Sequence, residues 1–349
     1  MPYNTRPMMA ALLVGLAAAM STLGCGGSAP KNVYAYVIQS TPINSGPSAG
    51  RIAEIHVASD GTLTPIGLAT VGPNYNNYNL GEIFVHPSGK YLLVNSGDRN
   101  TYELTIGSDG TLAENDAATL AGYPVGYTPD GRFVILGNGD NSTSTVSSYQ
   151  LASNGIPTLV TTLSLNYVFD SIALDPSGRY LYATSYDNLL SEYALSPSGA
   201  LVFVGSTAMP DCSITISPKE FLYCARNGYG NGVDVFSIDT STGGLTPTVS
   251  LPDLGGLVFH PSGKYAYGSN GGVTQYDVDE VTGNLVSQGT PIPGGYFVLD
   301  PSGEFGLAFA GYDAVSWYSI GSDGEATPGP SIALDPNSLA QGRMAIARR

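Results

Sequence analysis

A turn centred on proline recurs along this chain at nearly constant spacing, and this repeat constrains the fold more than any other feature of the sequence. In its fullest form the turn reads Pro-Ser-Gly followed by a charged residue, and its central prolines are Pro87, Pro129, Pro176, Pro218, Pro261 and Pro301. The gaps between them are 42, 47, 42, 43 and 40 residues. Such a period is typical of arrays of one supersecondary unit, so we expect one structural unit per repeat.

Each repeat has the pattern of four short strands. An apolar run such as Ile172–Leu174 precedes the proline turn and an aromatic-rich run such as Tyr180–Tyr182 follows it, which predicts a hairpin. A third run, such as Val273–Val278, alternates apolar and polar residues, and a Gly-containing turn leads to a fourth. The third runs begin at Ile52, Thr101, Val146, Leu190, Val233, Val273 and Val315. The pattern predicts an all-β, seven-bladed β-propeller of four-stranded blades.

The two ends of the chain are expected to complete one blade together. Residues 33–38 match the second strand of a repeat, so the first blade lacks an inner strand at its N-terminal end. Met344–Ala347 lies where the period predicts an inner strand, and we expect this C-terminal strand to close the ring. Ser331–Leu334 is then the outer strand of the last blade. The alternative is that Ser331–Leu334 itself closes the ring.

The first 24 residues have the features of an export signal. A single charged residue, Arg6, precedes the apolar run Ala10–Met20, which is too short to span a bilayer. Small residues then lead to Cys25, an arrangement that resembles the bacterial lipoprotein signal, in which the cysteine becomes the lipidated N-terminus. We expect a signal peptide at 1–24, a lipidated flexible tether at 25–30 and the propeller at 31–349. The alternative is an ordinary secretory signal with an incidental cysteine.

This signal predicts a lipid-anchored protein of the cell envelope, outside the cytoplasm. Residue 26 is Gly rather than Asp, so in a two-membrane bacterium we expect the outer membrane.

Cys212 and Cys224 flank a predicted hairpin whose turn contains Pro218. If Ser217 faces Glu220 across that turn, the two sulfur atoms become neighbours on adjacent strands. An exported protein can form disulfides. A cross-strand disulfide and a pair of buried free thiols are the two alternatives.

The charge balance excludes some partners. The chain has 13 Lys and Arg against 28 Asp and Glu, for a formal net charge of −15. No basic face is available to neutralise nucleic-acid phosphates or an anionic membrane surface.

The repeat itself resembles a known family. Pro-Ser-Gly-Lys-Tyr or Pro-Ser-Gly-Arg-Tyr, followed by Leu-Val-Asn or Leu-Tyr-Ala and then by a Val-x-x-Tyr strand, is similar to the lactonase-type seven-bladed propellers. This family includes 6-phosphogluconolactonase-like and muconate-cyclase-like proteins, and the pattern also resembles surface repeats with a Tyr-Val-Thr-Asn motif. The resemblance covers residues 31–349. It implies a propeller and, if the protein is an enzyme, a lactone hydrolase of the carboxylic-ester hydrolase class.

Strands alternate in direction within a blade, so the connections divide between two rims. The proline turns and the Gly-containing turns open on one, which we call the scaffold rim because its turns repeat. The other connections differ from repeat to repeat and form the loop rim, where we expect the functional site. Because Lys90, Arg132, Arg179, Lys219 and Lys264 belong to scaffold turns, a phosphate-binding cluster is not expected on the loop rim.

The loop rim is rich in Tyr, Asn and Asp. For ligand binding we expect Tyr123, Tyr167, Asn227, Tyr229 and Tyr296 to contribute. For catalysis we expect Asp170, Asp98 or Glu82 to activate water, and Arg226 or Arg99 to stabilise an oxyanion. The alternative is that Asn, Asp and Gly occur there because tight turns need them. His86 and His260 directly precede scaffold prolines and His56 lies inside the third strand of the first blade, so none of the three His is expected to be catalytic.

Two hypotheses follow for function. The first is a lactonase-like propeller that binds, and as an enzyme hydrolyses, a small neutral lactone or sugar-like ligand at the axial mouth of the loop rim. The second is a non-catalytic envelope propeller that recognises a protein or glycan. No metal-binding motif occurs, so no cofactor is expected, although converging carboxylates are suited to Ca²⁺. We expect a monomer.

Overall fold

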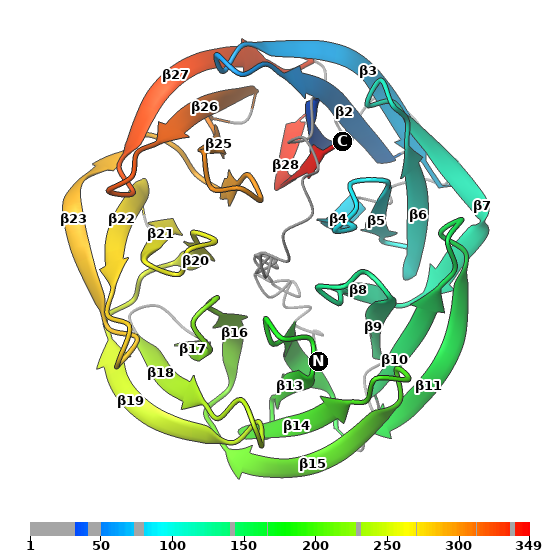
Figure 1. The fold of residues 1–349 in the computed structure, drawn as a ribbon, viewed down its shortest axis with the longest axis vertical. Helices are drawn as coiled ribbons and strands as arrows, with labels where there is room; N and C mark the ends of the chain where they lie inside the picture. Colours follow the sequence, from blue (N-terminus) through cyan, green and yellow to red (C-terminus); the bar gives the residue numbers. More distant parts are fainter. Residues whose placement is uncertain are drawn as a thin grey trace, which may run out of the picture.

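The structure is a computed structural model that describes residues 32–40, 50–72, 80–139, 144–165, 167–227, 232–269, 271–311, 313–335 and 339–349. In these ranges the chain forms 28 strands, which pair into seven four-stranded antiparallel sheets. The sheets stand around a central axis as the blades of a ring (Figure 1). Among the described residues no helix is long and apolar enough to cross a membrane. The all-β, seven-bladed propeller expected from the repeat is confirmed.

Every blade runs from an inner strand at the axis to an outer strand at the circumference (Figure 1). Blade 1 consists of β28 (Leu339–Arg348), β1 (Val33–Ser40), β2 (Gly50–Val57) and β3 (Leu63–Val71). Blade 2 consists of β4 (Leu80–Val85), β5 (Tyr91–Ser96), β6 (Asn100–Ile106) and β7 (Leu112–Ala121). Blades 3 and 4 consist of β8 (Tyr123–Tyr127), β9 (Phe133–Gly139), β10 (Ser144–Leu151), β11 (Pro157–Leu165), and of β12 (Phe169–Leu174), β13 (Tyr180–Ser185), β14 (Leu189–Leu195), β15 (Leu201–Ala208). Blade 5 consists of β16 (Cys212–Ile216), β17 (Phe221–Arg226), β18 (Val233–Ile238) and β19 (Leu245–Leu251). Blades 6 and 7 consist of β20 (Gly256–Phe259), β21 (Tyr265–Ser269), β22 (Val273–Val278), β23 (Leu285–Ile292), and of β24 (Phe297–Leu299), β25 (Phe305–Phe309), β26 (Ala314–Ile320), β27 (Ala326–Ala333).

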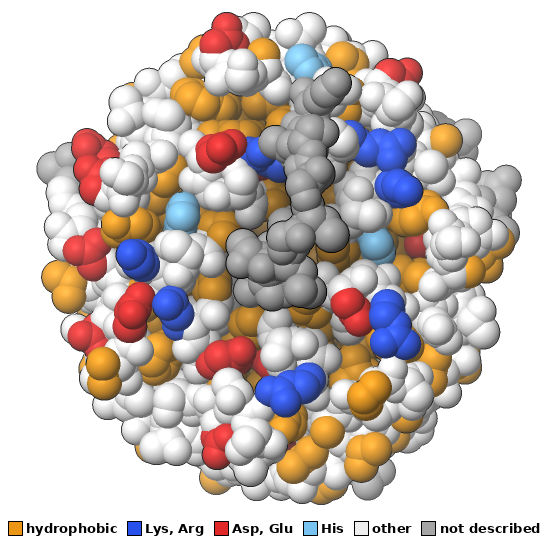
Figure 2. All heavy atoms as spheres, viewed as in Figure 1, with side chains coloured by type: hydrophobic (Ala, Val, Ile, Leu, Met, Phe, Trp, Pro, Cys, Tyr) orange, Lys and Arg blue, Asp and Glu red, His pale blue; other side chains and the backbone are white. Residues whose placement is uncertain are grey.

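The scaffold rim carries charges of both signs. Figure 2 looks onto this rim and shows Lys and Arg side chains alternating with Asp and Glu around the ring.

Two histidines form hydrogen bonds within and between the proline turns of this rim. His86 contacts Ser88 through Nδ1 and the carbonyl oxygen of Gly131 in the next blade through Nε2, at 2.7 and 2.8 Å. His260 makes the corresponding contacts with Ser262 and Gly303. The structure therefore gives these two rings a structural role.

Tyrosines of the second strands bind each blade to the next. The hydroxyls of Tyr36, Tyr182, Tyr223 and Tyr267 are buried, and each donates a hydrogen bond of 2.6 to 2.9 Å to a glycine carbonyl in the following blade. The acceptors are Gly110, Gly243, Gly283 and Gly324, which all have φ between 71° and 84°, a region that favours glycine. Each of these tyrosines thus fills the core with its ring and donates a hydrogen bond to a carbonyl of the neighbouring turn with its hydroxyl.

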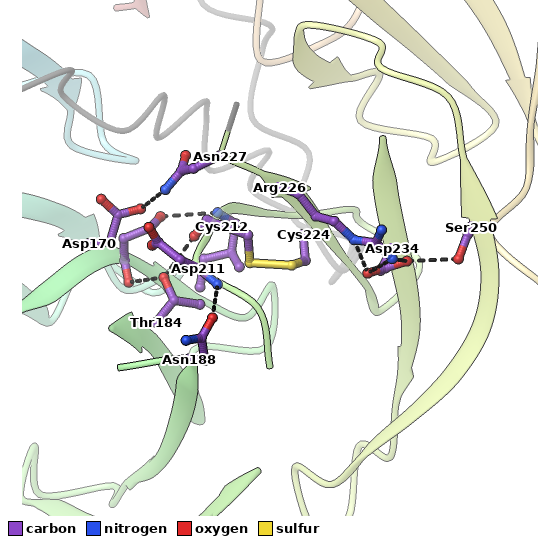
Figure 3. Close-up of a disulfide and its surroundings, with 12 residues drawn as sticks. Asp170, Thr184, Asn188, Asp211, Cys212, Cys224, Arg226, Asn227, Asp234 and Ser250 are labelled. Atoms are coloured by element: carbon purple, nitrogen blue, oxygen red, sulfur yellow. Dashed lines mark hydrogen bonds and ion pairs between the residues drawn. A yellow bond between two sulfur atoms is a disulfide. The ribbon is translucent and has the colours of Figure 1, made fainter. Parts of the chain in front are cut away.

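A disulfide joins Cys212 on β16 to Cys224 on β17, with their Cα atoms 5.4 Å apart (Figure 3). The register places Cys212 opposite Arg226 and Cys224 opposite Ile214, so the two cysteines are diagonal rather than directly opposite. The expected register, in which Ser217 faces Glu220, is therefore wrong by one residue. The disulfide is nevertheless present, and two free thiols are excluded. Cys25 lies outside the described residues.

The ring closes between the ends of the chain. Strand β28 pairs with β1, with Met344 opposite Val37 and Ala347 opposite Tyr34, while residues 331–333 belong to the outer strand β27. The expected closure by Met344–Ala347 is confirmed, and the alternative closure by Ser331–Leu334 is excluded.

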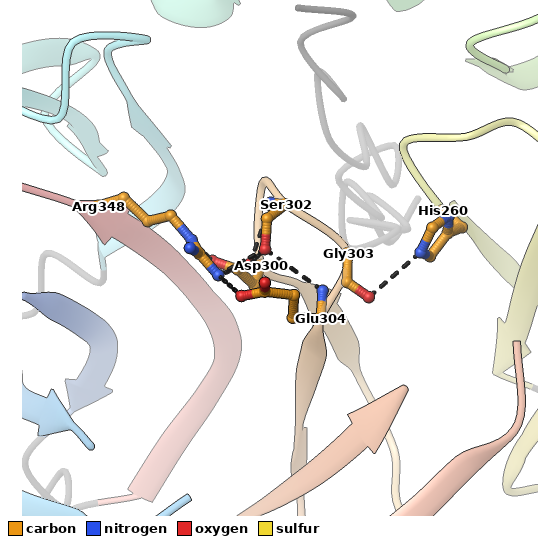
Figure 4. Close-up of polar contacts among 6 residues, drawn as sticks. All are labelled: His260, Asp300, Ser302, Gly303, Glu304 and Arg348. Carbon is orange, nitrogen blue, oxygen red and sulfur yellow. Dashed lines mark hydrogen bonds and ion pairs between the residues drawn. The ribbon is translucent and has the colours of Figure 1, made fainter. Parts of the chain in front are cut away.

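Arg348, at the end of β28, ties the closing strand to blade 7 (Figure 4). Its Nε donates to Asp300 Oδ1 at 2.6 Å, and Nη2 lies 2.6 Å from Glu304 Oε2. Asp300 is fully buried in the proline turn of blade 7, whereas Glu304 is exposed. A buried carboxylate needs its cation, because an unpaired charge in the interior is strongly destabilising.

Replacing this cation tests the closure. Arg348→Ala is expected to lower the free energy of unfolding by about 3 to 5 kcal/mol, because Asp300 loses its buried partner. The matched control is Arg132→Ala, whose guanidinium is exposed and lies 4.0 Å from Asp130, and which should cost less than about 1 kcal/mol. Urea unfolding followed by circular dichroism measures both. Equal losses in the two variants would contradict a special role for Arg348.

Candidate functional site

The loop-rim ends of the inner strands surround the axis and form the candidate site. We call this the axial mouth and define it by Glu82 on β4, Tyr123 on β8, Asp170 on β12, Asp211 before β16, Tyr296 before β24 and Arg343 on β28. Every inner strand starts at the loop rim, and all of these residues except Arg343 lie within the first three residues of an inner strand or directly before it, whereas Arg343 lies farther along β28. The mouth therefore gathers side chains from six blades that are far apart in the sequence.

The polar group with the most promising chemistry lies between blades 4 and 5. Asn227, which follows β17, donates from Nδ2 to Asp170 Oδ2 at 3.0 Å (Figure 3). The backbone of Asn227 also donates to the carbonyl oxygen of Asp211 at 3.1 Å. Asp211 N in turn donates to Asn188 Oδ1 at 3.3 Å. These bonds hold the Asp170 carboxyl and the Asp211 segment against each other across the blade interface.

The environment of Asp170 makes its carboxyl a better proton acceptor than an exposed aspartate. Burial raises the pKa of Asp170 above 3.8, and the neighbouring Asp211 carboxylate raises it further, while hydrogen bonds from Asn227 and Tyr186 act in the opposite direction. Burial and the charge of Asp170 raise the pKa of the Tyr186 phenol to about 12. Asp211 Oδ1 is buried and has no hydrogen-bond partner among the described residues. A partly buried carboxyl whose pKa is raised by burial and by a neighbouring like charge is typical of acid–base sites.

A second group lies on the other side of the mouth, where blades 7, 1 and 2 meet. Arg343 Nε donates to Glu82 Oε1 at 2.9 Å, and the guanidinium carbon of Arg343 lies 5.4 Å from the centre of the Tyr296 ring. Burial raises the pKa of Glu82, although the Arg343 charge opposes the rise. Burial chiefly raises the pKa of Tyr296 as well. Glu82 and Tyr296 are thus brought together at the mouth by an arginine that sequence analysis did not select.

Sequence analysis did not select Arg343 because its candidate arginines, Arg99 and Arg226, come from the loops of the rim. Arg343 lies inside a strand rather than a loop, and its partner is 261 residues away. Asp211 was also missed as a candidate. For Asp211 a positional signal was available, because it directly precedes an inner strand, the position that selected Asp170. Arg343 has no such signal, because it lies within β28.

The other expected catalytic residues have structural partners away from the axis. Asp98 accepts hydrogen bonds from Asn100 N at 3.0 Å and Tyr102 Oη at 2.5 Å, which fixes the turn between β5 and β6. Arg99, in the same turn, is exposed and has a φ of 67°. Arg226 forms a two-pronged ion pair with Asp234, at 2.7 and 2.6 Å. That pair joins the second and third strands of blade 5 (Figure 3), so it does not belong to the inner-strand ring.

The expected ligand-binding residues divide similarly. Tyr123 and Asn227 lie at the mouth or beside it, as Tyr296 does. Tyr167 packs outward, and its hydroxyl is 2.8 Å from the hydroxyl of Tyr193 on the third strand β14. Tyr229 lies outside the described residues. In the described ranges no group of three or more His, Cys, Asp or Glu is arranged to hold a metal ion.

Comparison with solved structures finds the same fold in bacterial proteins. A candidate 6-phosphogluconolactonase from Bacteroides uniformis superimposes with a TM-score of 0.69 at 18% identity, covering 91% of this chain and 100% of that one. The periplasmic gluconolactonase PpgL from Pseudomonas aeruginosa gives a TM-score of 0.66 at 17% identity, covering 90% and 99%. The chain has the lactonase-type propeller fold. Compared by sequence, it matches no protein-family model and no curated protein. At this identity the likeness establishes the fold alone.

The contact between the two carboxyls can be tested by titration. Asp211→Asn removes a like charge beside Asp170, so the pKa of Asp170 is expected to fall toward that of an ordinary aspartate. Asp187→Asn, which neutralises an exposed acid in the adjoining turn, is the matched control and should leave that pKa in place. Carboxyl-carbon NMR of the Asp170 side chain measures both. A pKa that does not respond to Asp211→Asn would show that the two carboxyls are not coupled.

Proposed function

We propose that this propeller hydrolyses a small neutral lactone at the axial mouth, with Asp170 as general base. The observation that carries the proposal is the Asp170 carboxyl, which is half-buried beside Asp211 and oriented by Asn227. A base with a raised pKa accepts a proton from water more readily than an ordinary aspartate does. The lactonase-type fold is compatible with this chemistry and does not specify it.

Asp170 accepts one proton in the first step of the reaction and returns it in the second. Asp170 removes a proton from a water molecule as the water oxygen attacks the lactone carbonyl carbon, and the carbonyl oxygen becomes an oxyanion. When the tetrahedral intermediate collapses, the ring C–O bond breaks and the alkoxide leaving group takes the proton back from Asp170. The product is a hydroxy acid, and no other reactant is consumed.

We assign stabilisation of the oxyanion to Tyr186 rather than to Arg226 or Arg99, which were expected from the sequence. Arg226 is engaged with Asp234, and Arg99 lies in an exposed turn between β5 and β6. The Tyr186 phenol adjoins the Asp170 carboxyl and keeps its proton at neutral pH, since its pKa is raised to about 12. Its hydroxyl donates to the ionised Asp170 carboxylate, and once Asp170 has taken the proton of water this hydrogen bond can pass to the developing oxyanion.

The charges of the mouth favour a neutral substrate. The six described residues that define it include three acidic side chains, Glu82, Asp170 and Asp211, and one arginine, which is paired with Glu82. A phosphorylated lactone would therefore meet net negative charge, and these described residues offer no cluster of cations to bind its phosphate. A sugar or aliphatic lactone carries no such penalty.

Kinetics on a panel of neutral sugar and aliphatic lactones test the proposal. Asp170→Asn is expected to lower kcat/KM by about 10² to 10⁴, while EDTA leaves the rate unchanged. The matched control Asp98→Asn removes a turn carboxylate and should keep the parent rate. Activity should rise with pH as Asp170 loses its proton, with a midpoint above that of an ordinary aspartate. Saturable ligand binding without turnover would contradict the hydrolase and would favour the second hypothesis, a non-catalytic propeller that recognises a glycan or protein.

We also propose that Cys25 carries the lipid that holds the protein in the cell envelope. The support is the apolar run ending in Gly24 and Cys25, together with a disulfide that suits an oxidising compartment. Cys25→Ser is expected to leave an unlipidated chain in the soluble fraction, with altered gel mobility. Membrane association with unchanged mobility in this variant would contradict lipidation.

A further inference from the structure

Exposed apolar side chains gather on the outer edges of blades 3 and 4. They lie on or beside the outer strands β11 and β15: Ile156, Leu159, Val160, Val202, Phe203 and Val204. These two strands contact each other around the circumference. Figure 2 shows apolar side chains along the lower edge of the molecule, where Figure 1 places β15.

A repeated bulge allows the outer strands to be compared position by position. In blades 1, 3, 4, 5 and 7 the pairing with the third strand shifts at the same point. The residue just before the shift is a proline in blades 1, 5 and 7, namely Pro65, Pro247 and Pro328. In blades 3 and 4 it is Leu159 and Phe203.

This difference changes what the edge can do. A proline on an outer strand has no N–H to offer a further strand, and natural sheets use it to prevent edge-to-edge pairing. Blades 3 and 4 lack this protection and present Leu159 and Phe203 instead, with 54% and 56% of their surfaces exposed. Two adjacent blades thus combine an unblocked strand edge with an apolar surface.

The occupant that fits this edge is a second copy of the chain. Each copy carries a net charge of −15, so two copies can approach closely only through an uncharged surface. Residues 156–165 and 201–208 contain no Asp, Glu, Lys or Arg. A two-fold axis places identical edge strands antiparallel, which is the geometry of sheet continuation, and brings the two copies of Phe203 to one interface.

We propose that two copies associate through their β15 edges, with β11 of each copy extending the apolar contact. The interface lies at the circumference and leaves both loop rims open. It does not depend on the proposed hydrolase activity, and it replaces the monomer expected from the sequence.

Sedimentation velocity tests this with the chain from residue 25 onward carrying Cys25→Ser. Between about 1 and 100 μM the average mass is expected to rise from that of one chain toward twice that value. Phe203→Pro places at the edge the residue that blades 1, 5 and 7 already tolerate, and should keep the mass at one chain throughout. Phe203→Lys, a second variant in case the proline disturbs folding, should do the same through charge. The control Val281→Ser changes an 83% exposed valine in a turn of blade 6 and should associate like the parent.

A parent chain that stays at the mass of one copy at every concentration overturns the proposal, and so does association that survives in Phe203→Pro and Phe203→Lys. Lactone hydrolysis is measured separately on the same samples. Loss of association with retained turnover, or the reverse, therefore distinguishes this inference from the proposed function.

Discussion

Pairing of the last strand with the first, β28 against β1, is the constraint on which the rest of this structure depends. It converts a row of seven sheets into a ring, and Arg348 secures the joint through the buried Asp300. The candidate site needs this joint, because Glu82, Arg343 and Tyr296 come from inner strands that are neighbours only when the ring is closed. An open array would keep its blades and lose this side of the mouth.

Around the ring the same small set of contacts recurs. A buried tyrosine hydroxyl meets a glycine carbonyl of the next blade at four interfaces, and His86 and His260 reach the next proline turn in the same manner. These contacts hold the scaffold rim rigid. The loop rim can therefore vary in sequence without disturbing the fold, as is usual for functional loops that a rigid scaffold positions.

The fold was predictable because its determinants are local and repeated. Turn residues and strand alternation located all seven third strands within two residues of their observed starts, from Gly50 in blade 1 to Ala314 in blade 7. The site was less predictable, because it depends on contacts between blades. Asp170 was selected from its expected place before an inner strand, and it lies at the start of β12, where its catalytic role stays a prediction. Asp98 was selected as another acidic residue of a loop, and it accepts the hydrogen bonds that fix a turn. Arg343 carries no local signal, since only ring closure brings it to Glu82.

We propose that a neutral lactone is held at the axial mouth against Asp170. A crystal structure with a lactam of matching ring size measures this most directly, because the amide resists hydrolysis and keeps the shape of the substrate. We expect lactam density at the loop-rim end of the axis, with its carbonyl carbon facing the Asp170 carboxyl and its oxygen within reach of Tyr186. A lactam bound on the scaffold rim or the outer edge, with the mouth filled by ordered water alone, would contradict it.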